Sequence, residues 1–330
     1  MPENYSSIQT DYCSACGKLK FEHSADCSAA EAEFLAFDKK IGKKWKAREI
    51  DPLVFKGVYP ISEIERDREQ AERMTHGTGT SRFDRTVIGE EWECELAEGI
   101  ERFGWFGPGA VVRKTKQRGY DDAFGNDLVI FLPNEKKEHV RCSLDATTSS
   151  DDEVVINKRV RDMKEIKNGK LPVIKYLFDE NGKPRGMTMP RVIVGARPRV
   201  VKRLEGLFMR DDKKLSDDVV QREIIEYMRG QLLWNIDFAL RRHAVSPPNR
   251  IITAGRNHDE ERAVLFQEIK RVRNALIAKP ALRDIVSANY TLDQILSRIL
   301  KQKNLPSGSG KEMFAMFDRD AMATVERLVG

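Results

Sequence analysis

Two aspartates, Asp127 and Asp145, each stand at the end of a short apolar run. The run 128–132 is apolar throughout, which is typical of a strand that is buried on both faces. The polar connection 133–138 is short enough to join the two runs as an antiparallel hairpin, which places the two carboxylates side by side at one end of a sheet. Because neighbouring carboxylates repel each other unless a hard divalent cation lies between them, the pattern predicts a magnesium site.

A second group of metal-ligating residue types lies near the N-terminus. Its members have the spacing C-x2-C-x6-H-x3-C and are Cys13, Cys16, His23 and Cys27. Cysteine and histidine at such short spacing suit a tetrahedral zinc ion, and four protein ligands leave no position open for a reacting water. The spacing resembles that of zinc knuckles and small treble-clef fingers. We therefore expect segment 1–30 to hold a structural zinc, which would supply the folding free energy of this short segment.

The elements around Asp127 and Asp145 must position the two carboxylates. The apolar periodicity predicts a helix at 90–103, strands at 111–116, 128–132 and 140–144, a helix from about 149 to 168, and strands at 171–178 and 187–194. A turn at 119–125 adds Asp121 and Asp122 as further acids close to the same end of the sheet. This order predicts an α+β fold with a mixed sheet flanked by helices.

The aspartate before an apolar strand and the acid after a hairpin resemble the PD-(D/E)XK superfamily of restriction-endonuclease-like nucleases. The resemblance covers residues 88–196, with Asn126-Asp127 at the position of Pro-Asp and Asp145-Ala146-Thr147 at that of (D/E)-X-K. It implies a restriction-endonuclease-like core and metal-dependent cleavage of DNA or RNA, with Asp127 and Asp145 holding Mg²⁺. The segment also resembles uncharacterised bacterial proteins from metagenomes, which imply no activity.

Thr147 stands where the superfamily has a lysine that positions or activates the attacking water. Catalysis then requires a lysine from elsewhere, and the candidates are Lys158 on the following helix or Lys114 and Lys116 on the preceding strand. A glutamate of the first core helix often joins the metal site in this superfamily, which makes Glu95, or Glu91, a candidate third carboxylate. The alternative for each glutamate is a solvated acidic face of the helix.

Basic residues are unevenly distributed along the chain, whose net charge is +5. Six Lys or Arg stand against one acid between residues 38 and 48, and eight stand against three acids between 191 and 214. Such clusters can neutralise phosphates and make binding salt-dependent, or they can simply be solvated helix faces. The residues that we expect to contact nucleic acid are Lys43, Lys44, Lys46, Arg197, Arg199, Lys202 and Arg203.

The chain divides into four expected regions. They are the zinc segment 1–30, a helical and linker region 31–85, the nuclease-like core 86–197 and a helical C-terminal region 198–330. Long amphipathic patterns at 215–242 and 259–279 have apolar faces broad enough to pack on the sheet, on a protein partner or on a second copy of the chain. No run reaches the length of about eighteen apolar residues that a membrane span needs, and the N-terminus has no secretion signal. We therefore expect a cytoplasmic protein without a membrane partner.

Three functions are compatible with these patterns. The first is a magnesium-dependent nuclease in which Asp127, Asp145, Glu95 and Lys158 form the catalytic site. The second is a catalytically inactive protein of the same fold that binds nucleic acid through its zinc segment and basic clusters. The third is a structural or assembly protein that uses its C-terminal helices. The missing lysine at Thr147 separates the first function from the second.

Overall fold

A computed structural model describes residues 35–76, 87–116, 119–136, 138–148, 152–179, 181–210, 213–243, 258–304 and 319–329. The strands are β1 Val111–Lys114, β2 Leu128–Pro133, β3 His139–Thr147, β4 Val173–Ile174, β5 Met187–Thr188 and β6 Arg191–Gly195. The helices up to β6 are η3 Asp38–Gly42, α2 Lys43–Lys46, η4 Pro52–Phe55, α3 Ile61–His76, α4 Val87–Glu101, α5 Tyr120–Ala123 and α6 Asp152–Lys167. The helices after β6 are α7 Pro198–Met209, η5 Lys213–Asp217, α8 Val219–His243, α9 His258–Arg271, α10 Arg273–Ala278, α11 Pro280–Lys303 and α12 Arg319–Val329.

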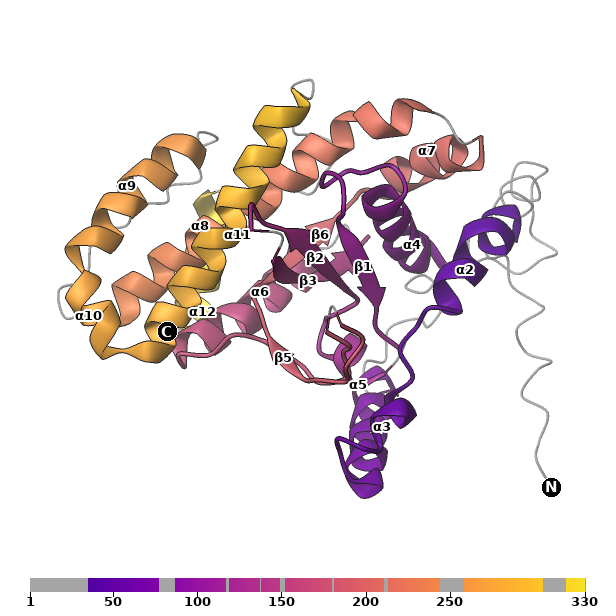
Figure 1. The fold of residues 1–330 in the computed structure, drawn as a ribbon, viewed down its shortest axis with the longest axis horizontal. Helices are drawn as coiled ribbons and strands as arrows, with labels where there is room; N and C mark the ends of the chain where they lie inside the picture. Colours follow the sequence, from indigo (N-terminus) through magenta and orange to yellow (C-terminus); the bar gives the residue numbers. More distant parts are fainter. Residues whose placement is uncertain are drawn as a thin grey trace.

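The main sheet has four strands in the order β1-β2-β3-β6 (Figure 1). The pairs β1–β2 and β2–β3 are antiparallel, and β3–β6 is parallel. A parallel pair needs a long crossover, which α6 provides between β3 and β6. Helices cover the sheet, so the prediction of an α+β protein with a mixed sheet flanked by helices is confirmed.

The central strand β2 is buried on both faces, as its unbroken apolar run predicts. Leu128, Ile130 and Leu132 point into a large core with α4, α7, α8 and α11. Val129 and Phe131 point the other way, into a smaller core with the β4–β5 hairpin. Because side chains alternate along a strand, Asp127 shares the second face with Val129 and Phe131.

The expected strand at 171–178 does not join the main sheet. Only Val173–Ile174 is extended, and it pairs with Met187–Thr188 in a separate two-stranded sheet. The reason is a competing acceptor: the backbone N–H groups of Lys175 and Tyr176 donate to the two carboxylate oxygens of Asp121, each at 2.8 Å. A strand whose N–H groups are taken by a side chain cannot extend a ladder through them.

Helix α8 packs against β6 and against α11, and nearly all its residues from Val220 to Leu240 are buried. Its Gln231 closes the outer edge of the sheet, since the side chain accepts from Ile193 N–H at 2.9 Å and donates to the Ile193 carbonyl at 2.7 Å. These two bonds replace a neighbouring strand at an edge that would otherwise be unpaired. The broad apolar face predicted for this region is therefore used inside the chain.

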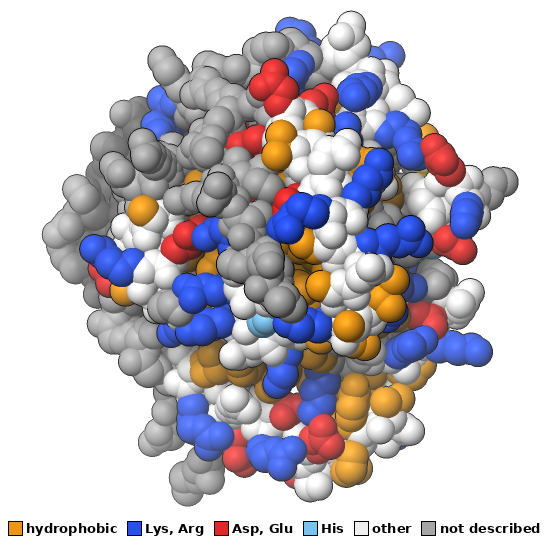
Figure 2. Space-filling model, turned by 90° about the vertical axis from the view of Figure 1, so that its left-hand side faces the viewer, with side chains coloured by type: hydrophobic (Ala, Val, Ile, Leu, Met, Phe, Trp, Pro, Cys, Tyr) orange, Lys and Arg blue, Asp and Glu red, His pale blue; other side chains and the backbone are white. Residues whose placement is uncertain are grey.

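Helices α9 and α10 form the outer layer of the C-terminal region. They expose Val264, Phe266 and Ile277, and the face seen in Figure 2 carries Lys and Arg side chains that are spread out rather than gathered in one patch. The expected protein partner or homodimer stays a prediction. None of the helices that the structure describes has the length and apolarity to cross a membrane.

Candidate metal centre

Asp127 and Asp145 lie next to each other where β2 begins and β3 approaches its end. The register pairs Leu128 with Leu144, and Asp127 N–H donates to the Leu144 carbonyl at 3.0 Å. The carboxylate of Asp127 also accepts from the backbone N–H of Ala146 at 2.6 Å. The hairpin thus fixes Asp127 against the backbone on either side of Asp145, as the strand pattern predicts.

Two further acids converge on Asp127. The other two acids are Glu93 of α4 and Asp122 of α5. One carboxylate oxygen from each of Glu93, Asp122 and Asp127 lies within 4.8 Å of the other two. Asp127 is buried, whereas Glu93 and Asp122 are half-buried. Three carboxylates from three different elements therefore open toward solvent at one end of the sheet. Hard cations such as Mg²⁺ or Ca²⁺ take such oxygen ligands.

The surroundings of Asp127 oppose its negative charge. Burial raises the pKa of its carboxyl well above the ordinary value, and the negative charges of Glu93, Asp145 and Asp122 raise it further. Lys158 acts in the opposite direction but does not outweigh these effects. A divalent cation beside Asp127 would remove the repulsion, since it favours the ionised form of every nearby carboxyl.

Asp145 has the opposite environment. Its two oxygens accept from Lys158 and, at 2.6 Å, from Arg161, both on α6. Burial tends to raise the pKa of Asp145, but Lys158 and Arg161 outweigh burial and hold this pKa below the ordinary value. Gly125, with φ of +74°, makes room for this arrangement because a Cβ at that position would lie 2.2 Å from the Asp145 carboxylate.

The structure brings two of the three expected lysines to this centre. The Lys158 ammonium binds Asp145, and burial lowers its pKa less than Asp145 and Asp127 raise it. Lys114 is buried and pairs with Glu93, with Glu49 at 3.9 Å. Lys116 is half-exposed and lies 4.0 Å from Glu49. Lys158 is therefore a protonated cation beside the acids. It reaches from α6 to the face of β3 on which Asp145 and Thr147 lie.

Comparison of the chain with models of known protein families, with curated proteins and with solved structures finds no match. The centre is therefore characterised by its own geometry and charge. The four zinc-type ligands Cys13, Cys16, His23 and Cys27 lie outside the described residues, and a zinc site there stays a prediction.

Glu95 does not reach the metal centre, contrary to expectation. Consecutive helical residues are about 100° apart, so Glu93 and Glu95 point to nearly opposite sides of α4. Glu95 is 0% exposed and lies with Glu91, Glu205 and Lys202 between α4 and α7. Glu93, on the side of α4 that faces β1, lies in the candidate metal centre where we expected Glu95.

Burial leaves Glu95 without compensation. Neither of its oxygens has a hydrogen-bond partner among the described residues. Burial raises the pKa of Glu95 well above the ordinary value, and it raises the pKa of Glu91 to about 7, although Lys202 binds Glu91 at 3.0 Å. A carboxyl whose pKa is higher in the folded than in the unfolded state stabilises the fold most below the unfolded-state pKa. This stabilisation is lost as the pH rises from the unfolded-state pKa through the folded-state pKa.

Glu95→Gln is therefore expected to flatten the pH dependence of stability. Between the ordinary pKa of a glutamate and the raised pKa of Glu95 in the folded state, the unfolded chain ionises Glu95 while the folded chain keeps it protonated. In that interval the unfolding free energy falls by up to roughly 1.4 kcal/mol per pH unit as the pH rises. The substitution removes that slope, which urea unfolding at several pH values would measure. Glu69→Gln, on the exposed part of α3, is the matched control. An unchanged slope in Glu95→Gln would contradict the assignment.

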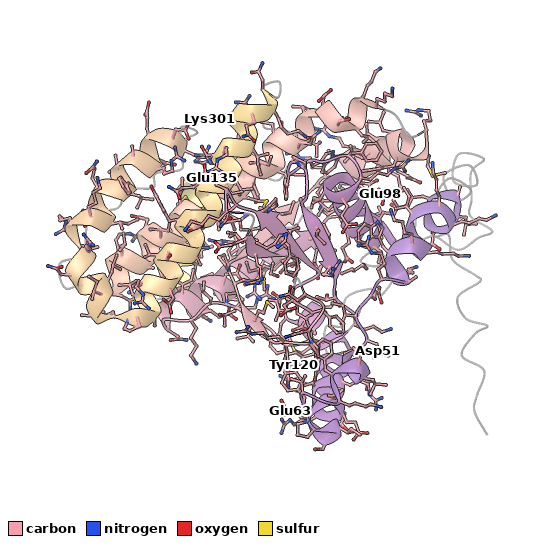
Figure 3. All side chains as sticks on the ribbon, viewed as in Figure 1. Asp51, Glu63, Glu98, Tyr120, Glu135 and Lys301 are labelled. Atoms are coloured by element: carbon pink, nitrogen blue, oxygen red, sulfur yellow. The ribbon has the colours of Figure 1, made fainter. Side chains whose placement is uncertain are left out.

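The two aspartates of the 119–125 turn have separate roles. Asp122 belongs to the candidate metal centre, whereas Asp121 is buried and its carboxylate accepts from the backbone N–H groups of Lys175 and Tyr176. Burial raises the pKa of Asp121 to about 6. Figure 3 shows Tyr120 of α5 and Glu63 of α3 in the same lower part of the molecule, where Glu63 also pairs with Lys175 at 2.5 Å. Asp121 thus fixes α5, and with it Asp122, to the segment after β4.

Four of the seven cations that we expected to contact nucleic acid are paired with acids of this chain. Lys44 binds Glu98 at 2.6 Å, beside α2 in Figure 3, and Lys46 binds Asp38 at 3.0 Å. Lys202 lies between Glu91 and Glu205, and Arg203 pairs with Asp218 at 2.6 Å. Lys43, Arg197 and Arg199 are exposed. Trp45 is fully buried and donates to Glu98, so it is not available to stack on a base.

Proposed function

We propose that residues 87–195 form a metal-dependent nuclease of the PD-(D/E)XK type that hydrolyses phosphodiester bonds in DNA or RNA. The observation that carries the proposal is the convergence of Glu93, Asp122 and Asp127 beside the Asp145–Lys158 pair. The order of the elements, a helix, three strands, a crossover helix and a parallel strand, supports the same conclusion. It agrees with the resemblance that the sequence carries around Asp127 and Asp145.

The three carboxylates fit a divalent cation. Two oxygens on opposite sides of one Mg²⁺ lie about 4.2 Å apart, at twice the usual Mg–O distance. The oxygens of Glu93, Asp122 and Asp127 lie within 4.8 Å of one another, so a small side-chain rotation suffices. The remaining coordination positions face solvent, because Glu93 and Asp122 are only half-buried. A bound cation would withdraw electron density from a phosphate and stabilise the negative charge of the transition state.

Lys158 takes the role of the superfamily's lysine, whose position in this chain is occupied by Thr147. Its ammonium is held by Asp145 and lies close enough to Asp127 to affect the charge of that carboxyl. From there it can donate a hydrogen bond to a water or to a phosphate oxygen. Asp145 and Arg161 position Lys158. The Asp145 carboxylate pairs with both Arg161 and Lys158, and these contacts limit how far the Lys158 ammonium can move.

The proposed reaction is the hydrolysis of a phosphodiester. The oxygen of a water forms a bond to phosphorus, one phosphorus–oxygen bond to a sugar breaks, and a proton from the water passes to the leaving oxygen or to solvent. Glu93, Asp122 and Asp127 would hold the cation, which when bound would supply a Lewis acid for the phosphate. Lys158 orients the water or neutralises the charge that develops on the phosphate. No other co-reactant is required.

A cleavage assay tests the proposal. Full-length protein is incubated with single-stranded and duplex DNA and RNA, with Mg²⁺, Mn²⁺ or Ca²⁺ or with a chelator. We expect cleavage with Mg²⁺ or Mn²⁺ and none with the chelator. Salt-sensitive binding without cleavage under any of these cations would contradict the enzyme and favour the inactive binding protein. Neither binding nor cleavage would favour the structural protein.

A further inference from the structure

The described surface has a recess, of about 380 Å³, at the far end of β3 from the acidic centre. It is lined by Arg141, Val173, Arg185, Gly186, Met187 and Thr188. Its volume lies in the lower part of the range of about 300–1,000 Å³ that is usual for small-ligand sites. The β4–β5 hairpin forms one wall, and β3 of the main sheet contributes Arg141.

The charges of the recess favour an anion. Arg141 and Arg185 supply two guanidinium groups, whose planar N–H donors match the oxygens of a phosphate. Arg185 is exposed, and none of the ion pairs within the described part of the chain involves it. Arg141 lies over the ring of Phe131, 5.9 Å from its centroid, and interacts electrostatically with the half-buried Asp179. The carboxylate of Asp179 also accepts from the N–H groups of Asn181 and Lys183 in its own turn. The Thr188 hydroxyl adds a donor, and Val173 and Met187 add an apolar wall.

The recess and the acidic centre lie on the same face of the sheet. Arg141 and Asp145 are four residues apart on β3, so their side chains point to the same side and their backbones are about 13 Å apart. A second connection is the segment that starts at Val173, because its Lys175 and Tyr176 bind Asp121, the neighbour of Asp122. The two sites are therefore held at a fixed separation by β3 and by residues 173–176.

We propose that this recess is a phosphate-binding subsite that receives one phosphodiester group of a nucleic acid whose scissile phosphate lies at the acidic centre. The proposal rests on the proposed nuclease function and specifies how the substrate is positioned. Arg141 and Arg185 bind the phosphate oxygens, and Val173 and Met187 contact the attached sugar or base. Because the separation from Asp145 is fixed, the subsite sets the register of the strand at the cleavage site and a minimum substrate length.

The test compares an Arg141→Gln/Arg185→Gln double variant with the wild-type full-length chain. Binding of fluorescein-labelled oligonucleotides is measured by fluorescence anisotropy in a chelator, so that no cleavage interferes. We expect the double variant to bind at least about tenfold more weakly, because a charge-assisted phosphate contact is lost. The slope of log affinity against log salt concentration should fall by about one, which corresponds to one phosphate fewer neutralised. Arg283→Gln, which removes one exposed positive charge at α11, is the matched control for the single variant Arg185→Gln and should leave the affinity unchanged.

Two further arms separate the sources of the phosphate. Inorganic phosphate and a nucleoside monophosphate are titrated into both proteins by calorimetry. If they bind the wild type and not the double variant, while oligonucleotide affinity is equal in both, the recess serves a free phosphate compound and the proposed subsite is overturned. Equal oligonucleotide affinity without any phosphate binding overturns it as well. Thermal melting checks the fold, and the exposed Arg185→Gln alone carries the test if the double variant unfolds.

The outcomes also separate this inference from the nuclease proposal. If the wild type cleaves no substrate but the double variant loses oligonucleotide binding, the nuclease fails and the subsite stands. If the wild type cleaves and the double variant binds and cleaves equally well on substrates of every length, the subsite fails and the nuclease stands. Loss of binding together with loss of cleavage on substrates long enough to reach the recess supports both.

Discussion

Asp127→Asn is expected to abolish divalent-cation-dependent cleavage and to stabilise the metal-free protein at the same time. Asparagine keeps the oxygen that accepts from Ala146 N–H but removes the charge that faces Glu93, Asp122 and Asp145. Losing the buried carboxylate of a cation site should lower cleavage by at least about a thousandfold. Without the cation, relief of like-charge repulsion should raise the melting temperature.

Thermal melting with and without Mg²⁺ separates these effects. In the wild type, a cation at 100 times its dissociation constant should add about 2.7 kcal/mol of stability, and Asp127→Asn should lose this gain. Asp284→Asn, which removes an exposed carboxylate at the start of α11, should change neither cleavage nor the response to Mg²⁺. Normal cleavage by Asp127→Asn would place the cation elsewhere.

Lys158→Met is expected to reduce cleavage by about 10²–10³-fold while nucleic-acid binding and the stabilisation by Mg²⁺ remain. Methionine retains most of the side-chain volume but removes the cation between Asp145 and Asp127, and Arg161 continues to pair with Asp145. The measurement is the cleavage rate at saturating substrate, together with anisotropy and melting. A loss of rate with unchanged binding distinguishes an action on the reacting groups from a loss of structure.

The other two lysines make the assignment specific. Lys116→Met is the matched control, because Lys116 is half-exposed and its nearest described carboxylate is that of Glu49, at 4.0 Å. It should cleave at the wild-type rate. Lys114→Met should weaken the response to Mg²⁺ instead, since Lys114 binds Glu93 rather than Asp145. If Lys158→Met cleaves normally and Lys114→Met does not, Lys114 is the relocated lysine.

The position of the centre follows from local sequence. The apolar run of β2, the short polar connection and the alternation along β3 require that Asp127 and Asp145 meet at one end of the hairpin, and they do so. Period-2 alternation and hairpin register are local properties, so few residues are needed to predict them. The α+β class and the crossover helix follow in the same way from apolar periodicity.

The remaining members of the centre depended on tertiary packing. Helix α4 has acids at many positions, and its sequence does not determine which side faces β1; packing against the sheet selects Glu93 and buries Glu95 against α7. In the same way, only the docking of α5 separates the structural role of Asp121 from that of Asp122. Glu93 and Lys114 come from α4 and β1, and only the packing of α4 against β1 brings their charges together.

The sequence by itself determined the hairpin, its two aspartates and the types of residue near them, because these follow from spacing along one strand or one turn. The tertiary structure alone decided which members of the basic clusters are paired with acids. Lys44, Lys202 and Arg203 form basic runs in the sequence, yet their partners Glu98, Glu91 and Asp218 come from other elements. Coulomb interactions depend on distance in space and on burial, and neither can be read from position along the chain.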